Sequence, residues 1–470
     1  MAVSLILRCA GCAAAVDPAD PSTRSPFRCP NAERARDIDH VLAWDPVSAG
    51  VTEWPTETST NPYVRYRTLQ HAYWLNRALG ATDADHVALV ERLDKAIAGV
   101  GGTGFVATPM IELNPASTKT LGVDEVWAKV ETRNVAQSHK ARHLMGILLN
   151  LEVRRISARV PLAIASCGNA AIAAATLGKA SRRVLNVFIP TWTKPAVREH
   201  LRSLGATLTE CPRLSSDPPG DPCLHRFHDA LAKGALPFCV QGSENGFSID
   251  GGASLGHEMA DQFAMLGFVP DRLFVQVGGG ALGASIIRGL ADAAALGVIP
   301  KLPIFHVVQA EGCAPLVRAW RLVAERALRS LDREQLTQDH QVAAAVLLED
   351  ASQAAVTEAL TFAATHRSRF MWPWEEEPTS IATGILDDET YDWFALVRAM
   401  LATGGWPIVA TDSQFERALE LACPEPAAGH CCDADETGTA GLAGPLALGD
   451  NVQLGASERV CVVFSGARRT

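Results

Sequence analysis

The segment Gly278 to Gly283 has the residue types that suit phosphate binding. It reads Gly-Gly-Gly-Ala-Leu-Gly, follows an apolar strand-like run and opens a helix-like run. Backbone N–H groups without obstructing side chains, together with a helix N-terminus, form a cradle for a phosphate. The same glycines match the Gly-x-Gly-x-x-Gly dinucleotide fingerprint, for which Glu311 could supply the ribose-binding acid. The alternative without a ligand is a tight turn that brings a helix close to a sheet.

Lys140 has the surroundings of a reactive amine. It stands at the expected first turn of a helix, after a strand-like run that ends at Val130 and a polar loop. A cation is unfavourable there because the helix N-terminus is already positive. Such a position lowers the pKa of a lysine and favours the neutral amine, which is the form that attacks a carbonyl. The alternative is a solvated surface lysine, the usual place for this residue type.

Two further polar segments follow strand-like runs. Ser166 to Ala170 reads Ser-Cys-Gly-Asn-Ala and precedes a helix-like run. Its small residues and free amides could hold a carboxylate, or Asn169 could simply be the N-cap of the helix. Ser465 ends the last strand-like run, where its hydroxyl could meet a ring nitrogen or cap the chain.

These residues need a scaffold of alternating strands and helices to bring them together. Apolar runs typical of short buried strands occupy residues 126–130, 162–165, 184–189, 274–277, 303–309 and 460–464. Runs rich in Ala and Leu, typical of helices, occupy residues 140–153, 170–177, 195–204 and 284–296, with a longer interrupted one at 314–365. Strand, loop and helix in this rhythm predict an α/β protein whose parallel sheets are covered by helices.

Composition excludes several classes of protein. The formal net charge is -10 and there is no basic stripe, so we expect no nucleic-acid partner. No apolar run reaches the ~18 residues of a membrane span. The apolar start lacks the basic residue of a secretory signal and is interrupted by Arg8. The twelve cysteines are too scattered for a disulfide scaffold. We therefore expect a cytoplasmic protein.

In order and content, these segments resemble the motifs of the fold-type II pyridoxal-phosphate enzymes, the group of threonine synthase, the threonine and serine dehydratases and cysteine synthase. Thr108 to Met110 is similar to the Thr-Pro-Leu of this group, and Asn134 to Lys140 to its Asn-Pro-Thr-Gly-Ser-Phe-Lys block. The matches to its Ser-Ser-Gly-Asn-Ala segment and its phosphate loop are Ser166 to Ala170 and Gly278 to Gly280. Val308 to Pro315 and Pro378 to Gly384 look most like threonine synthase, whereas Val463 to Ala467 looks more like the dehydratases.

The resemblance implies a tryptophan synthase β-like fold, in which two parallel-sheet α/β domains hold the cofactor between them. The large domain would comprise residues 46–144 and 240–470, and the small domain residues 145–239. Residues 1–45 would form a separate cysteine-containing segment.

The resemblance also implies roles for single residues. Lys140 would bind pyridoxal 5'-phosphate as an internal aldimine and shuttle protons, and Asn169 would hydrogen-bond the 3'-oxygen of the cofactor. Ser465 would meet the pyridine nitrogen; its neutral hydroxyl does not keep the ring protonated, which suits elimination or replacement at the side chain. The implied cofactor ligands are Lys140, Asn169, Gly278, Gly279, Gly280, Ala281 and Ser465. The implied substrate contacts are Ser166, Cys167, Gly168, Asn169 and His139.

The sequence departs from the group around the lysine. Val135, Ala136 and Gln137 replace its Pro-Thr-Gly, and His139 replaces its Phe. The imidazole of His139 is either an additional acid–base group or substrate contact, or a structural histidine. Threonine synthase must also hold the phosphate of its substrate. The nearby cations that could do so are Arg133, Arg142 and His143, which could equally be solvated or paired with acids.

The N-terminal segment resembles the zinc-ribbon-like start of some threonine synthases. Cys9, Cys12 and Cys29 supply three metal ligands, but Ala32 stands where a fourth cysteine would complete the pattern. A structural zinc site needs four ligands, and His40 is the nearest candidate for the fourth. The alternative is a degenerate segment without metal.

We therefore expect an enzyme that uses pyridoxal phosphate for β- or γ-elimination or replacement on a small amino acid, similar to threonine synthase and assembled as a homo-oligomer. The alternative within the group is a deaminating serine/threonine dehydratase. The alternatives outside it are a nicotinamide-dependent oxidoreductase that uses the glycine loop and a non-catalytic relative that keeps the fold as a binding scaffold.

Overall fold

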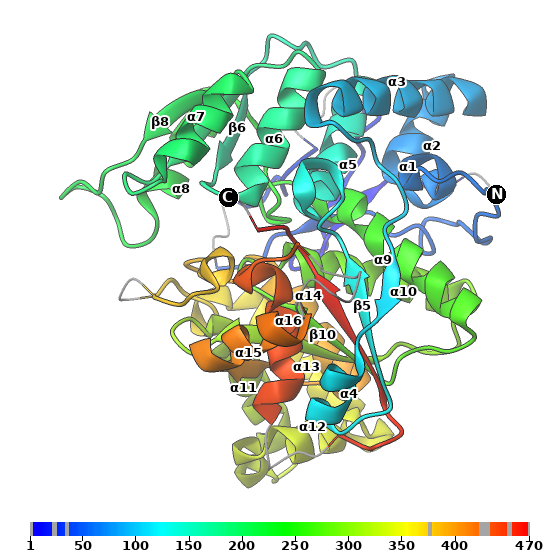
Figure 1. Cartoon of the computed structure of the whole chain (residues 1–470), viewed down its shortest axis with the longest axis vertical. Helices are drawn as coiled ribbons and strands as arrows, with labels where there is room; N and C mark the ends of the chain where they lie inside the picture. Colours follow the sequence, from blue (N-terminus) through cyan, green and yellow to red (C-terminus); the bar gives the residue numbers. More distant parts are fainter. Residues whose placement is uncertain are drawn as a thin grey trace.

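Two parallel sheets form the framework of the chain in the computed structural model (Figure 1). The structure describes residues 3–20, 26–32, 37–374, 378–422, 433–448 and 454–468. The smaller sheet lies in the upper part of Figure 1 and the larger one in the lower part, each with helices packed around it. The predicted α/β class with parallel sheets is confirmed.

The larger sheet has six strands in the order β12-β11-β10-β13-β5-β4. All neighbours are parallel except β4, which pairs antiparallel with β5 at one edge. Its central strands are buried along their whole length, as expected for parallel strands with helices on both faces. The strand bounds are β4 Met110–Glu112, β5 Glu125–Val130, β10 Arg272–Gln276, β11 Ile304–Ala310, β12 Ile408–Ala410 and β13 Arg459–Phe464.

The smaller sheet has four parallel strands in the order β8-β7-β6-β9. All four come from one stretch of chain between β5 and β10. Their bounds are β6 Leu162–Ala165, β7 Leu185–Ile189, β8 Thr207–Glu210 and β9 Leu236–Pro237. The helices that accompany them are α6 Asn169–Ala180, α7 Pro195–Ser203 and α8 Pro222–Ala232.

Three helices, α5 Lys140–Val153, α9 Phe247–Leu266 and α10 Ala281–Ala295, pack in sequence between the two sheets. Glycines let them approach closely: a Cβ on Gly146 of α5 would lie 2.5 Å from the Cα of Gly251 of α9. A Cβ on Gly256 of α9 would likewise lie 2.9 Å from the Cα of Gly289 of α10. Backbone contact therefore fixes the helix whose first residue is Lys140.

The remaining helices surround this framework. The predicted helical run at 314–365 divides into three helices, because short 3-10 turns interrupt it at Glu334–Gln338 and Asp350–Ser352. The bounds are α1 Pro62–Arg65, α2 His71–Ala78, α3 Asp83–Gly101, α4 Pro115–Leu121, α11 Pro315–Arg329, α12 His340–Leu348, α13 Gln353–Thr365, α14 Trp393–Thr403, α15 Asp412–Ala422 and α16 Glu436–Leu448. Among the described residues, no helix combines the length and apolarity needed to cross a membrane.

The N-terminal segment is a small antiparallel sheet in the order β2-β1-β3, with bounds β1 Leu7–Cys9, β2 Ala15–Val16 and β3 Leu42–Ala43. It packs against the body of the protein. A Cβ on Gly246, just before α9, would overlap the Leu42 carbonyl, and the rings of Phe27 and Phe247 meet edge to face. The indole N–H of Trp393, the first residue of α14, donates to the Asp39 carboxylate at 2.9 Å. This segment is thus continuous with the core.

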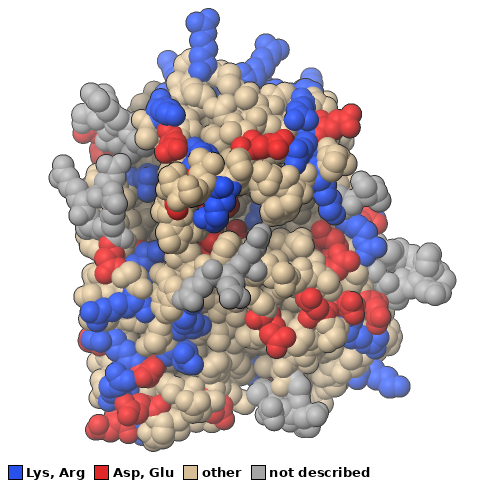
Figure 2. All heavy atoms as spheres, turned by 90° about the vertical axis from the view of Figure 1, so that its left-hand side faces the viewer, with Lys and Arg blue, Asp and Glu red and all other residues tan. Residues whose placement is uncertain are grey.

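The face shown in Figure 2 carries both kinds of charge. Lys and Arg side chains gather at the top of this view, and Asp and Glu side chains are interspersed with them further down. This face is therefore neither uniformly positive nor uniformly negative.

Candidate active site

Lys140 is the first residue of α5, where the sequence analysis places it. Burial lowers the pKa of its amine below the ordinary lysine value, although the nearby Asp387 and Asp392 carboxylates oppose that shift. Within the described ranges, the Lys140 amine forms no hydrogen bond or ion pair. An amine with these properties is a good nucleophile for a carbonyl.

The loop before Lys140 is fastened to the end of strand β13. Ser138 forms an antiparallel bridge with Gly466, and the Ser465 carbonyl accepts hydrogen bonds from the backbone N–H and the Nδ1–H of His139, each at 3.0 Å. Gln137 adopts a left-handed conformation with φ 56°. Glycine takes this conformation most readily, and glycine is the residue that the fold-type II motif has here.

The segment Ser166 to Asn169 lies beside the same strand end. Asn169 is the first residue of α6, and Gly168 is its N-cap without any side-chain capping bond, so the alternative in which Asn169 is the N-cap is wrong. A Cβ on Gly466 would lie 2.8 Å from the Asn169 amide nitrogen, so glycine at 466 leaves room for this side chain. Burial, together with the nearby Asp221 carboxylate, raises the pKa of the Cys167 thiol to about 11, so the thiol stays protonated.

The glycine loop connects β10 to the N-terminus of α10. Gly280 is the N-cap with φ 101°, and no side chain caps the helix, so its first amides remain available for an anion. A Cβ on Gly279 would lie 2.9 Å from the Tyr391 ring. The Asp387 carboxylate accepts a hydrogen bond from the Gly279 N–H at 2.5 Å. The loop thus already holds one oxyanion, that of Asp387.

A family profile described as pyridoxal-phosphate dependent enzyme matches residues 103–367, which is more than half of the chain. The chain belongs to the pyridoxal-phosphate-dependent enzyme family. The fold-type II resemblance drawn from the motifs is confirmed, and this membership replaces the dinucleotide interpretation of the glycine loop.

Two curated relatives are threonine synthases of archaea. The protein of Methanosarcina acetivorans is 28% identical over 219 residues, which are 45% of this chain and 49% of that protein. The protein of Methanocaldococcus jannaschii is 28% identical over 227 residues, 46% of this chain and 50% of that protein. These matches span about half the length of either relative. A threonine deaminase structure from Solanum lycopersicum superposes with a TM-score of 0.54 at 14% identity, over 83% of this chain and 86% of that one, and shows the shared fold.

The arrangement of these residues fits pyridoxal phosphate. The glycine loop offers amides and space for a phosphate, and the partly buried Lys140 amine has no bonding partner among the described residues. Two side-chain atoms of the adjoining loop, Ser138 Oγ and His139 Nε2, are buried without a hydrogen-bond partner. When the cofactor is bound, its phosphate would replace the Asp387 carboxylate at the Gly279 N–H.

His139 presents an acceptor inside this site. Its Nδ1 donates to the Ser465 carbonyl, so Nε2 carries the lone pair. Burial and the neighbouring Lys140 hold the pKa of His139 well below the ordinary histidine value. The imidazole is therefore neutral and can accept a proton or a hydrogen bond from a group bound near Lys140.

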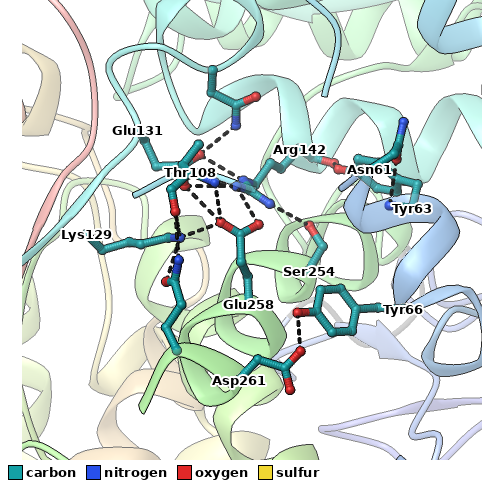
Figure 3. Close-up of polar contacts among 12 residues, drawn as sticks. Asn61, Tyr63, Tyr66, Thr108, Lys129, Glu131, Arg142, Ser254, Glu258 and Asp261 are labelled. Carbon is teal, nitrogen blue, oxygen red and sulfur yellow. Dashed lines mark hydrogen bonds and ion pairs between the residues drawn. The ribbon is translucent and has the colours of Figure 1, made fainter. Parts of the chain in front are cut away.

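Of the alternatives left open for Arg142, the structure shows the pairing with acids and not a free cation for a substrate phosphate. Its guanidinium is fully buried and donates to Glu131 at 2.8 and 2.9 Å and to Glu258 at 3.1 Å (Figure 3). His143 is also not a cation, because burial and Lys140 lower its pKa to about 3. Arg133 lies on the surface.

Two motif residues, Thr108 and Asn134, belong to this buried network through hydrogen bonds to Glu131. Thr108 donates its hydroxyl proton to Glu131 at 2.5 Å, and the Asn134 amide donates to the same carboxylate at 2.6 Å. Lys129 is fully buried and forms an ion pair with Glu258. The network joins β5, α5 and α9. Its two cations, Lys129 and Arg142, balance its two carboxylates, Glu131 and Glu258.

Three residues near the glycine loop or strand ends escaped the sequence analysis. Asp387 and Asp392 lie more than a hundred residues beyond the glycines that they contact, in a loop without a recognisable motif. Gln276 donates to the Ser465 hydroxyl at 2.8 Å. The only signal for Gln276 was its place as a polar residue ending an otherwise apolar strand.

The structure brings Cys9, Cys12, Cys29 and His40 together at the N-terminal sheet. Their ligand atoms all lie within 4.8 Å of one another, with Cys9 Sγ 3.4 Å from His40 Nδ1 and Cys12 Sγ 3.5 Å from Cys29 Sγ. Three sulfurs and one imidazole nitrogen at such distances fit a tetrahedral zinc ion.

Proposed function

We propose that the chain catalyses elimination or replacement at the β- or γ-carbon of a small amino acid, with pyridoxal phosphate attached to Lys140. The observation that carries this proposal is the partly buried Lys140 amine, which has no hydrogen-bond or ion-pair partner among the described residues, between the Ser465 end of β13 and the acids that touch the glycine loop. The archaeal threonine synthase relatives support it.

Bound pyridoxal phosphate supplies a ring that accepts the electrons released when an amino acid loses its α-proton. The chain's own residues then perform the remaining tasks. The amides that open α10 hold the phosphate, and those that open α6 hold the substrate carboxylate. Lys140 Nζ moves the α-proton, and the neutral Nε2 of His139 can accept a proton from the substrate side chain or orient it.

The charges around Lys140 favour a substrate without a phosphate. Arg142 is neutralised by two glutamates and His143 is uncharged, so neither offers a second phosphate site. The Asp387 and Asp392 carboxyls raise the pKa of Lys140, so the charges that act on it are negative and would not favour a second phosphate. This observation supports the second candidate, a deaminating serine/threonine dehydratase, over transfer of a phosphate leaving group.

A product survey tests the proposal. The holoenzyme is mixed with serine, threonine, O-phosphoserine and O-phosphohomoserine, and keto acid, ammonia, phosphate and new amino acids are measured. Loss of the side-chain substituent is expected, with serine or threonine preferred. Lys140→Ala should abolish this loss of the substituent. Lys179→Ala, which changes an exposed lysine that donates to the Ser203 carbonyl, should leave it unchanged. Racemised or transaminated products without loss of the substituent would refute the proposal.

We also propose that Cys9, Cys12, Cys29 and His40 bind a structural zinc ion. The backbone N–H of Asn31 donates to the Cys29 sulfur at 3.4 Å, and its side-chain amide donates to the Cys12 sulfur at 3.6 Å. Metal ligands commonly form such additional hydrogen bonds with neighbouring groups. Elemental analysis of protein purified without chelators should find one zinc per chain. Cys9→Ser should release it and loosen the N-terminal sheet, and Cys211→Ser, at a buried cysteine outside the cluster, should retain it. Absence of zinc from the wild type would reject the site.

A further inference from the structure

Gln276 is a buried amide at the end of β10, two residues before the glycine loop. Its Nε2 faces four acceptors, which are the carbonyls of Thr437 at 3.1 Å, Gly438 at 2.8 Å and Val463 at 3.1 Å, and the hydroxyl oxygen of Ser465 at 2.8 Å. Carbonyl oxygens only accept, so turning the amide over would place its oxygen against three others. The orientation of Gln276 is therefore fixed.

This contact also fixes the direction of the Ser465 hydroxyl. An amide nitrogen donates and does not accept, so Ser465 Oγ must be the acceptor and its proton must point elsewhere. Ser465 is almost fully buried, and in the described part of the chain its hydroxyl proton has no acceptor. A buried donor without an acceptor is unfavourable, so this proton is available for a bound ligand.

We propose that Gln276 is a positioning residue that makes Ser465 a hydrogen-bond donor to the pyridine nitrogen of the bound cofactor. The inference rests on the proposed attachment of pyridoxal phosphate at Lys140 and on the role of Ser465. A nitrogen that accepts this proton is not itself protonated. Gln276 thereby determines the protonation state of the cofactor ring from a position where, among the described residues, its amide nitrogen hydrogen-bonds to Ser465 and to backbone carbonyls.

The ring protonation state has consequences for the reaction. An unprotonated ring delocalises negative charge from the α-carbon less fully, so the substrate loses its leaving group instead of being reprotonated or transaminated. Removing the Gln276 donor frees the lone pair of Ser465 Oγ that Gln276 occupies and lets the hydroxyl rotate, so that a lone pair can face the ring nitrogen. The ring nitrogen can then acquire a proton and donate it to Ser465.

The experiment is nitrogen NMR of the holoenzyme reconstituted with pyridoxal phosphate carrying 15N in the ring. The wild type should show an unprotonated ring nitrogen at neutral pH. Gln276→Met keeps the length of the side chain but removes its N–H donors. It should move the 15N resonance toward the protonated value and raise the pKa of the ring nitrogen by about one unit. Ser465→Asp supplies the protonated reference. In a Ser465→Ala background, Gln276→Met should change nothing further.

A protonated ring in the wild type would overturn the inference, as would an unchanged resonance in folded Gln276→Met. A shift that persists in the Ser465→Ala background would also overturn it, because Gln276 would then not act through Ser465. Should Gln276→Met not fold, Ser465→Thr decides, since its hydroxyl can receive the same hydrogen bond and should keep the ring unprotonated. Absence of cofactor from Lys140 would instead refute the proposed function.

Discussion

Removing the guanidinium of Arg142 tests whether the buried network supports the active site. Arg142→Met leaves a side chain of similar length but strands two buried carboxylates, Glu131 and Glu258, near a single remaining cation, Lys129. Breaking one partner of a buried ion pair costs ~3–5 kcal/mol, so the free energy of unfolding should fall by that amount. Arg417→Met, which breaks an exposed pair with Glu420, should cost less than about 1 kcal/mol.

The effect should depend on pH with a definite sign. In the wild type, burial alone would raise the pKa of Glu131, but attraction to Arg142 outweighs it and lowers the pKa to about 2. That contribution to stability is present above the ordinary pKa of 4.5 and is lost as the pH falls toward 2. Without Arg142 the pKa of Glu131 should rise above 4.5, so the variant should lose stability as the pH rises through the new value.

Urea unfolding followed by tryptophan fluorescence, at several pH values, measures both effects. Glu131→Gln combined with Arg142→Met should recover part of the lost stability, because it removes one stranded charge. Equal costs for Arg142→Met and Arg417→Met, or the same pH dependence as the wild type, would refute the reasoning.

Three further predictions concern the cofactor. Borohydride should attach pyridoxal phosphate to Lys140, because its partly buried amine has no bonding partner among the described residues; peptide mapping that found the label on Lys129 or Lys179 would contradict this. Gly279→Asp should abolish cofactor absorbance, since a charged side chain would enter the phosphate cradle. Gly99→Asp, at a position where a Cβ meets open space, should keep the absorbance. Retained absorbance in folded Gly279→Asp would count against the cradle. Asp387→Asn should lower the Kd for pyridoxal phosphate at least about tenfold, because it replaces the negative charge that competes with the phosphate at the Gly279 N–H by a weaker neutral acceptor; an unchanged Kd by fluorescence titration would argue against competition.

Local pattern was sufficient for much of the fold. The strand ending at Val130, the helix Lys140–Val153 and the strand ending at Phe464 all lie where periodicity and flanking residues predict them. Helix α9 was missed, although it contacts both α5 and α10, because its glycines at 251, 252 and 256 look like a loop in sequence. These glycines serve close helix packing, and single-sequence patterns do not distinguish that use from a turn.

The candidate site divides in the same way. Lys140, the glycine loop and Ser465 follow strands, and the carboxyl ends of parallel strands meet at one edge of a sheet, so their proximity follows from topology. Pairing of Arg142 with an acid was one of the alternatives that the sequence left open, but its second partner Glu258 could not be foreseen, because Glu258 lies on the unrecognised helix α9. Asp387 and Gln276 act through contacts with residues more than a hundred positions away, which no local motif encodes.

The N-terminal sheet has a practical consequence for anyone who shortens this protein. Its Leu42 carbonyl lies against Gly246, and its Asp39 accepts a hydrogen bond from the indole of Trp393. The neighbouring Asp392 carboxylate accepts a hydrogen bond from the Gly242 N–H and contacts the glycine loop. An expression product that starts at residue 46 would expose Phe247 and Trp393 to water, and the loop around Asp392 would lose the segment that packs against it. Such a product should aggregate or be cut by proteases near residues 385–392, even though every residue of the matched family profile would still be present.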